Sequence, residues 1–269
     1  MGQDDELWRQ VWEGTHPVLY WGRRGFGLLP SPPRCKLCNM PFRGVGGAII
    51  QVFAGKRPSV MNPHLCNTCE TYARTHPGGA EVALTMLFAD IRGSTALAES
   101  LGTTAFTAVI DRFYRAATDV LFRTDAMINR LLGDEIVALF LPGYVGKDHA
   151  SQAVKTAQAL LRATGHGEPD GPWVPVGAGI HTGRAFVGTV GTPGSATDFT
   201  ALGDDVNLTA RLAAAAGAGE ILVSDATRGA ALLSTDLEQR RLAVKGKSEP
   251  IDVWVVGAGV PEPVPAPPH

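Results

Sequence analysis

Two apolar segments that each meet an aspartate constrain this chain more than any other feature. Residues 86–90 are apolar until they end in Asp90, and the apolar stretch 131–140 is interrupted by Gly133 and Asp134. Two carboxylates at neighbouring strand ends can hold a pair of divalent metal ions against a triphosphate. An aspartate at the end of a strand is more often simple turn chemistry, so neither segment is decisive alone.

The order of expected elements indicates an α+β fold. Hydrophobic spacing predicts helices over 103–124, 149–164 and 205–215, and strands over 82–90, 174–180, 185–190 and 220–223. Hairpins are expected for 126–131 with 136–141, and for 241–244 with 251–255, while His181-Thr-Gly183 predicts a turn. Because hairpins and helices mix instead of alternating strictly, we expect a sheet with helices on one face.

The composition is that of an ordinary globular protein. The 269 residues are 45% hydrophobic and 19% charged, enough for one large domain and a smaller one. A net charge of −2 creates no global field that would recruit nucleic acid or an acidic membrane. No apolar run reaches bilayer-spanning length, and the acidic start of the chain is unlike a signal peptide. We therefore expect a cytoplasmic protein without a membrane partner.

All four cysteines fall in two Cys-x-x-Cys pairs, Cys35 with Cys38 and Cys66 with Cys69. In a reducing compartment such pairs bind metal more often than they form disulfides, and four thiolates suit tetrahedral zinc. An iron–sulfur cluster is the alternative. We expect one structural Zn²⁺ in a module over 31–78 that resembles a zinc ribbon, with a regulatory role as the alternative to a structural one. His64 could be a substitute ligand, but we expect it to be a bystander.

The segments around this module have their own signals. Residues 1–30 are rich in tryptophan and glycine and should begin with a short helix, and the proline-rich tail 257–269 should be extended. Within the module, residues 44–47 and Pro58 predict turns, and the second cysteine pair could open a helix. The module contains several basic residues, which suggest nucleic-acid binding as a function. Because no aromatic residues are interleaved with them, we do not expect this function. The basic residues are Arg34, Lys36, Arg43, Lys56 and Arg57.

Five segments, including the two that carry Asp90 and Asp134, resemble in order the class III nucleotidyl (adenylate/guanylate) cyclases. They are Phe-Ala-Asp-Ile-Arg-Gly-Ser-Thr at 88–95, Leu-Gly-Asp-Glu at 132–135, Gly-Ile-His-Thr-Gly-Arg at 179–184, the stretch 203–211, and Val-Lys-Gly-Lys at 244–247. The resemblance implies a ferredoxin-like catalytic domain with a mixed, mainly antiparallel sheet over 79–256. It also implies attack of a ribose 3′-hydroxyl on the α-phosphate of a nucleoside triphosphate, with release of pyrophosphate.

The resemblance also assigns roles to residues. Asp90 and Asp134 would bridge two Mg²⁺ or Mn²⁺ ions, with the Ile91 carbonyl completing one shell. Asn207 would orient the ribose and Arg211 would stabilise charge on the α-phosphate; four residues apart on a helix, they share a face. The triphosphate would be bound by Gly93, Ser94, Thr95, Arg184 and Lys245, with Lys247 as a substitute for the last. We interpret His181 as a structural turn residue.

Base choice falls on Arg130 and Thr200. The family usually reads adenine with a lysine and an aspartate or threonine, and guanine with a glutamate and a cysteine, so Thr200 fits adenine. Arg130 replaces the lysine with a larger planar fork that could also reach a cytosine, uracil or guanine edge, or point away from the base. We expect ATP as substrate, with CTP or UTP as the alternative.

The resemblance implies a homodimer, because family members place the metal aspartates on one protomer and the Asn/Arg pair on the other. Two alternatives to the enzyme remain. One is a non-catalytic, nucleotide-binding regulatory dimer, although the four central residues are intact. The other is a metal-sensing scaffold whose cysteine module carries the function.

Overall fold

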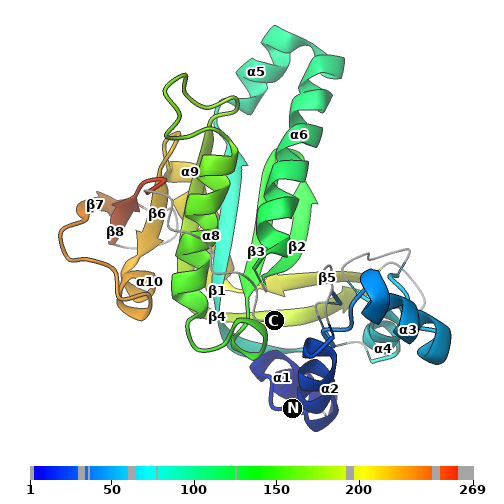
Figure 1. The fold of residues 1–269 in the computed structure, drawn as a ribbon. Coiled ribbons are helices and arrows are strands. Elements are labelled where there is room, and N and C mark those ends of the chain that lie inside the picture. Colours follow the sequence, from blue (N-terminus) through cyan, green and yellow to red (C-terminus); the bar gives the residue numbers. More distant parts are fainter. Residues whose placement is uncertain are drawn as a thin grey trace.

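A mixed sheet forms the centre of the computed structural model, which describes residues 3–29, 34–35, 37–59, 65–76, 78–124, 126–191, 197–243 and 249–259. Eight strands in this part of the chain follow the order β2-β3-β1-β4-β6-β8-β7, with β5 also paired to β4 (Figure 1). Their bounds are β1 Gly79–Ile91, β2 Met127–Leu132, β3 Glu135–Phe140, β4 Val176–Gly191, β5 Thr197–Leu202, β6 Ile221–Ser224, β7 Glu238–Leu242 and β8 Ile251–Val256.

The described strand pairs are antiparallel except for β4 with β6. The two long strands β1 and β4 pair along the whole of β1. One edge of β4 then carries two partners, β6 opposite residues 178–180 and β5 opposite residues 186–191. The β2–β3 hairpin around Gly133, which has a φ of +62°, confirms the prediction from sequence.

The predicted turn at His181-Thr-Gly183 is wrong, because β4 runs through it without a break. Its polar side chains are satisfied by other elements and not by solvent. Thr182 hydrogen-bonds through Oγ1 with Thr85 at 2.8 Å, and His181 Nδ1 with Ser224 Oγ at 2.7 Å. Buried polar groups with such partners cost little, so the strand can continue.

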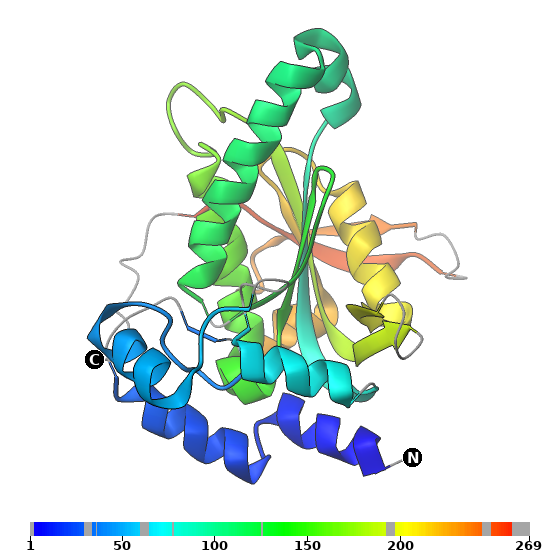
Figure 2. The same cartoon turned by 90° about the vertical axis from the view of Figure 1, so that its right-hand side faces the viewer.

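Helices cover both faces of the sheet, and the expectation of helices on one face is therefore wrong. In Figure 2, α6 (Thr103–Phe122) and α8 (His149–Ala163) lie on one side and α9 (Asp204–Ala215) on the other. The reason is that β1 is apolar on both faces: Leu87 packs in the α6–α8 cluster, while Leu84 and Met86 pack in the opposite one. The other helices are α1 Gln3–Glu13, α2 Pro17–Gly27, α3 Gly44–Ala54, α4 Asn67–Thr75, α5 Ser94–Leu101, α7 Pro142–Val145 and α10 Asp225–Ala230.

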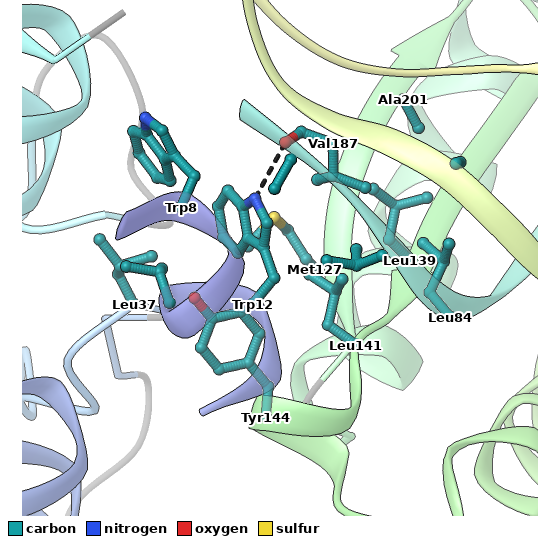
Figure 3. Close-up of a cluster of buried hydrophobic side chains, with 14 of the residues drawn as sticks. Trp8, Trp12, Leu37, Leu84, Met127, Leu139, Leu141, Tyr144, Val187 and Ala201 are labelled. Carbon is teal, nitrogen blue, oxygen red and sulfur yellow. Dashed lines mark hydrogen bonds between the residues drawn. The ribbon is translucent and has the colours of Figure 1, made fainter. Parts of the chain in front are cut away.

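The amino-terminal helix α1 packs directly on the sheet beside the cysteine segment. Figure 3 shows Trp12 between Leu37 and Val187, and its Nε1 donates to the Val187 carbonyl at 2.9 Å. Trp8 stacks on Trp12 with ring centroids 5.0 Å apart. The four cysteines belong to the same buried cluster as these tryptophans. The module and the sheet therefore share one core.

Two predictions for the cysteine segment have opposite outcomes. Helix α4 begins directly after Cys66, as expected. Residues 44–47 do not form a turn but open helix α3. Gly47 is buried there, and a Cβ on it would lie 2.7 Å from the carbonyl carbon of Phe42, so glycine permits close packing. Residues 260–269 of the predicted tail lie outside the described residues.

Among the helices that the structure describes, none combines the length and the apolar character that crossing a bilayer requires.

Candidate active site

The sheet brings Asp90 and Asp134 together. Asp90, at the end of β1, stands opposite Glu135 in the β1–β3 register, and Ile91 N donates to the Asp134 carbonyl at 3.2 Å. The hairpin that carries Asp134 is thus held against the strand end that carries Asp90. Both aspartates and the Ile91 backbone therefore occupy one edge of the sheet, as predicted.

The Asp90 carboxylate fits a cation. One oxygen, Oδ2, forms an ion pair with Arg92, while Oδ1 is buried and has no hydrogen-bond donor in the described part of the chain. The pKa of Asp90 is raised to about 6: burial is the main cause, the neighbouring Asp134 carboxyl adds to it, and the Arg92 charge opposes it. A buried oxygen without a donor beside a second carboxylate is the oxygen-rich setting that Mg²⁺ and Mn²⁺ prefer. The residues present therefore fit divalent metal ions.

The chain turns from this edge directly into helix α5. Gly93 is the N-cap of this helix and has a φ of +65°, a conformation that favours glycine. No side chain at the N-cap accepts a hydrogen bond from the first amides of the helix. The helix begins at Ser94, followed by Thr95. Uncapped amides at a helix start suit an anion, and these lie next in sequence to Asp90.

Arg92 has a role in the site that sequence reasoning missed. Besides Asp90, its Nη1 donates to the carbonyl of Ala214 at 3.1 Å and to that of Ala216 at 3.5 Å. It therefore connects the end of β1 to the carboxyl end of α9. The contact spans more than 120 residues, and no local pattern could have revealed it.

The amino-terminal end of helix α9 lies away from Arg92, which contacts the carboxyl end of the same helix. Near its start, Asp205 Oδ2 accepts from the Arg184 backbone N at 2.8 Å, and Asp205 Oδ1 lies 3.3 Å from His181 Nε2. Asn207 is exposed and Arg211 is partly buried. Asn207 precedes Ala214 by seven residues, about 10 Å along the axis, and so lies away from the Arg92 contact. His181 has structural partners, as expected, although it lies in a strand and not in a turn.

Arg184 is also far from the aspartate pair in the same chain. In the β1–β4 register Arg184 stands opposite Ala83 and Asp90 opposite Gly177, a separation of seven residues or about 23 Å. Its guanidinium forms an exposed ion pair with Glu81 at 2.7 Å. One chain therefore carries two groups of candidate residues, the aspartates at one end and Asn207 with Arg184 toward the other, and does not bring them together.

The candidate base-reading residues lie on two strands that are not paired with each other. Thr200 on β5 pairs with Gly188, and Arg130 on β2 pairs through its backbone with Val137 beside a register shift. Strands β2 and β5 contact each other. The Arg130 side chain, and Lys245 and Lys247 entirely, lie outside the described residues.

The four cysteines form a compact buried cluster. Their Sγ atoms all lie within 4.8 Å of one another, and those of Cys38 and Cys66 are 3.8 Å apart. A zinc tetrahedron with Zn–S bonds of about 2.3 Å has edges of about 3.8 Å, so the cluster fits this ion. Hydrogen bonds from the Cys35 thiol first, and then from Cys38 and Cys69, lower the pKa of Cys66, while the hydrogen bonds with Cys35 and Cys66 raise that of Cys38.

Comparisons with known proteins agree with this geometry. The adenylate and guanylate cyclase catalytic domain matches residues 80–257. An adenylate cyclase of Anabaena cylindrica is 29% identical over 187 residues, which are 65% of this chain and 37% of that protein. The chain thus spans little more than a third of that relative's length.

Two solved structures are similar in both sequence and fold. The guanylyl cyclase Cya2 is 30% identical with a TM-score of 0.58, covering 69% of this chain and 96% of that one. The adenylyl cyclase CyaB from P. aeruginosa is 29% identical with a TM-score of 0.57, covering 66% and 95%. Since the family match covers well over half of the sequence, this chain belongs to the adenylate and guanylate cyclase catalytic domain family.

Proposed function

We propose that the protein is a nucleotidyl cyclase that converts a nucleoside triphosphate, most favourably ATP, into a 3′,5′-cyclic nucleotide and pyrophosphate. The observation that carries the proposal is the pair Asp90 and Asp134 at one sheet edge, with a buried carboxylate oxygen that has no donor in the described residues. The 3′-oxygen forms a bond to the α-phosphorus, the bond to the β-phosphate oxygen breaks, and the hydroxyl proton passes to water.

Two divalent ions complete the proposed site. When bound by Asp90, Asp134 and the Ile91 carbonyl, they would acidify the 3′-hydroxyl and neutralise the triphosphate. The chain's own contribution is to hold the substrate. The amides of Gly93, Ser94 and Thr95 at the start of α5 would bind phosphate oxygens through the positive end of the helix.

Asn207 and Arg211 would act on the opposite side of the nucleotide. Asn207 would orient the ribose, and the Arg211 guanidinium would stabilise charge that develops on the α-phosphate. Arg184 and Lys245 would bind the triphosphate; Arg184 would first exchange its partner Glu81, which is inexpensive for an exposed pair.

The separation of these groups supports a homodimer with two composite sites. About 23 Å of backbone separate the Asp90 and Arg184 positions along one sheet, which favours contributions from two chains to one site. A two-fold axis would place α9 of one protomer opposite the aspartates of its partner. A single chain would then be inactive.

For the base we favour adenine, read by Arg130 and Thr200. The relative from Anabaena cylindrica, which is named an adenylate cyclase, supports this choice, and the likeness to a guanylyl cyclase does not. A pyrimidine triphosphate is the alternative, because the arginine fork could also pair with cytosine or uracil. A second alternative is a regulatory dimer that binds the nucleotide without turnover.

The cysteine cluster is proposed to hold one structural Zn²⁺. Four buried thiols at tetrahedral spacing support it. Metal content and visible absorption would separate zinc from an iron–sulfur cluster, since only the latter is coloured.

Product identity tests the function. The protein would be incubated separately with ATP, GTP, CTP and UTP plus Mn²⁺, and the products read by mass spectrometry, with Asp90→Ala as control. Cyclic AMP that disappears in the variant is expected. A cyclic pyrimidine would overturn the base assignment alone. No product from any nucleotide, with the dimer and zinc verified, would favour the regulatory alternative.

Mixing two inactive variants tests the composite site. Asp90→Ala and Arg211→Ala each remove one half of every site. In an equal mixture half of the dimers are mixed and each retains one intact site, so about a quarter of the original activity should return. Failure to recover activity after verified subunit exchange would contradict the shared site while leaving the cyclase reaction standing.

A further inference from the structure

The charge of this chain is unevenly distributed. Residues 14–69 contain seven of its 24 lysines and arginines and none of its 26 aspartates and glutamates, so the remainder has 17 basic against 26 acidic residues. The net charge of −2 therefore conceals a strongly positive amino-terminal segment. Four thiolates and one Zn²⁺ would remove only two of the seven positive charges.

Helix α3 in this segment turns its apolar side outward. Val45, Ile49, Val52 and Phe53 recur at helical spacing and are 73%, 46%, 78% and 86% exposed. The buried residues of this helix are glycines, Gly46 and Gly47. A helix at the surface of a globular protein normally has the reverse arrangement, with polar residues outward.

Helix α2 and the residue after it also expose apolar side chains. Val18, Trp21 and Leu28 are 74%, 70% and 83% exposed, and the helix has no fully buried residue. The Lys56 ammonium, just after α3, lies 5.5 Å from the ring centroid of Phe26 on α2, so the two helix ends are close. Figures 1 and 2 place both helices at the end of the molecule opposite α5, and hence away from Asp90.

We propose that this surface, made of α2, α3 and their basic residues, binds the face of an anionic phospholipid bilayer. Val52, Phe53 and Trp21 would enter the interface, while the exposed Arg24, Arg43 and Arg57 contact lipid phosphates. Such binding needs no spanning helix, and tryptophan is enriched at bilayer interfaces. The catalytic edge would face the aqueous side.

The chemistry favours lipid over the other occupants. Nucleic acid phosphates could pair with the arginines, but they would not bury the apolar side chains of Val52 and Phe53 on the helix face. A second copy placed face to face would bring two positively charged segments together. An anionic bilayer satisfies both the apolar and the basic groups.

Sedimentation with lipid vesicles tests the proposal. The whole 269-residue chain, purified in the presence of zinc, would be mixed with vesicles of phosphatidylcholine alone and with vesicles that also contain phosphatidylserine. We expect binding to the mixed vesicles, weakened by salt, and at least about tenfold weaker binding to the neutral ones. A Val52→Ser/Phe53→Ser variant should lose at least about tenfold in affinity. The matched control Leu232→Asn changes a side chain that is 91% exposed elsewhere, at a φ of +52° that asparagine accommodates.

A charge variant separates the two contributions. Arg43→Gln/Arg57→Gln should weaken binding to the anionic vesicles, whereas Arg115→Gln, at an exposed position on α6, should not. Unchanged zinc content and melting temperature would establish that the variants fold. No binding to either vesicle, or equal binding to both, would overturn the proposal. The proposal would also be overturned if this surface were found to bind RNA or a second copy of the chain instead, and if the same substitutions abolished that binding.

Discussion

At the scale of single residues, Arg92 shows how the site depends on contacts that no motif contains. Its guanidinium joins the Asp90 carboxylate to the carbonyls of Ala214 and Ala216, and its side chain is only 19% exposed. The motif around Asp90 predicted this aspartate as a metal ligand and a helix that starts shortly after it. It could not indicate that the arginine ties this edge to α9.

Replacement of Arg92 by methionine should therefore destabilise the protein. It leaves two carbonyls and a carboxylate without their donor, and the free energy of unfolding should fall by about 1–3 kcal/mol in urea titrations. Arg184→Met is the matched control, because its ion pair with Glu81 is well exposed and should contribute about 0–1 kcal/mol. Equal losses in the two variants would contradict a special role for Arg92.

His166 predicts a pH dependence of stability. Its Nε2 accepts a hydrogen bond from Val176 N at 2.9 Å, and burial lowers the pKa of the imidazole below its ordinary 6.5. Because the pKa is lower in the folded state, this contribution is complete above about pH 6.5 and is lost as pH falls through the folded value. Unfolding free energies at about pH 7.5 and about pH 5 should differ less in His166→Gln than in the original protein. An unchanged difference would show that His166 does not carry the effect.

At the scale of elements, the sequence was informative where periodicity is local. The helix over 103–124 and the hairpin around Gly133 are close to α6 and to β2 with β3. The errors arise where long-range partners decide. His181, Thr182 and Gly183 have turn composition, yet they lie in β4 because Ser224, Thr85 and Thr227 bond the two polar side chains. A Cβ on Gly183 would lie 2.2 Å from Asp205 Oδ2, so this glycine marks close packing and not a turn.

The same limit applies to the candidate site. Family motifs predicted that Asp90 and Asp134 would be neighbours, and the β1–β3 register brings them together. The motifs were silent on where α9 ends relative to Asp90, because that depends on packing between residues more than 100 positions apart. A motif specifies chemistry at one point, whereas the distance between two such points is set by the sheet register and the helix packing.

The contact between α9 and β4 leads to a prediction at this scale. A Cβ on Gly179 would lie 2.2 Å from Ala213 N and 2.7 Å from Leu212 Cβ, so alanine there must push α9 away from the sheet. Gly179→Ala should lower the free energy of unfolding by about 2–3 kcal/mol and reduce cyclase turnover, because α9 carries Asn207 and Arg211. Gly229→Ala in α10, where a Cβ meets nothing within 4 Å, should be neutral or stabilising by up to about 1 kcal/mol. If both substitutions had the same effect, close helix packing at Gly179 would be excluded as the cause.

At the scale of the whole molecule, the cysteine segment shares one buried core with the sheet. Trp8, Trp12 and the four cysteines belong to one buried cluster with Leu84 and Val187 of the sheet. From the sequence we expected a module beside the catalytic domain, because the spacing of the Cys-x-x-Cys pairs predicts local metal binding and not contacts with other elements. No pattern in the sequence indicated that α1 would pack between the cysteine cluster and the sheet.

Removal of the proposed zinc should therefore affect the entire fold. Without the proposed zinc, the four buried thiols would lose their common ligand, and the side of the core that holds Trp8 and Trp12 would lose its support. We expect a strong chelator, or Cys66→Ser, to lower the melting temperature of one cooperative transition, with tryptophan fluorescence and the circular dichroism of the sheet changing together. Thr68→Ser, between the second pair of cysteines, is the matched control and should leave both signals unchanged. If the module melted first while the sheet kept its transition temperature, the metal would stabilise only its own segment, and the shared core would not couple the two.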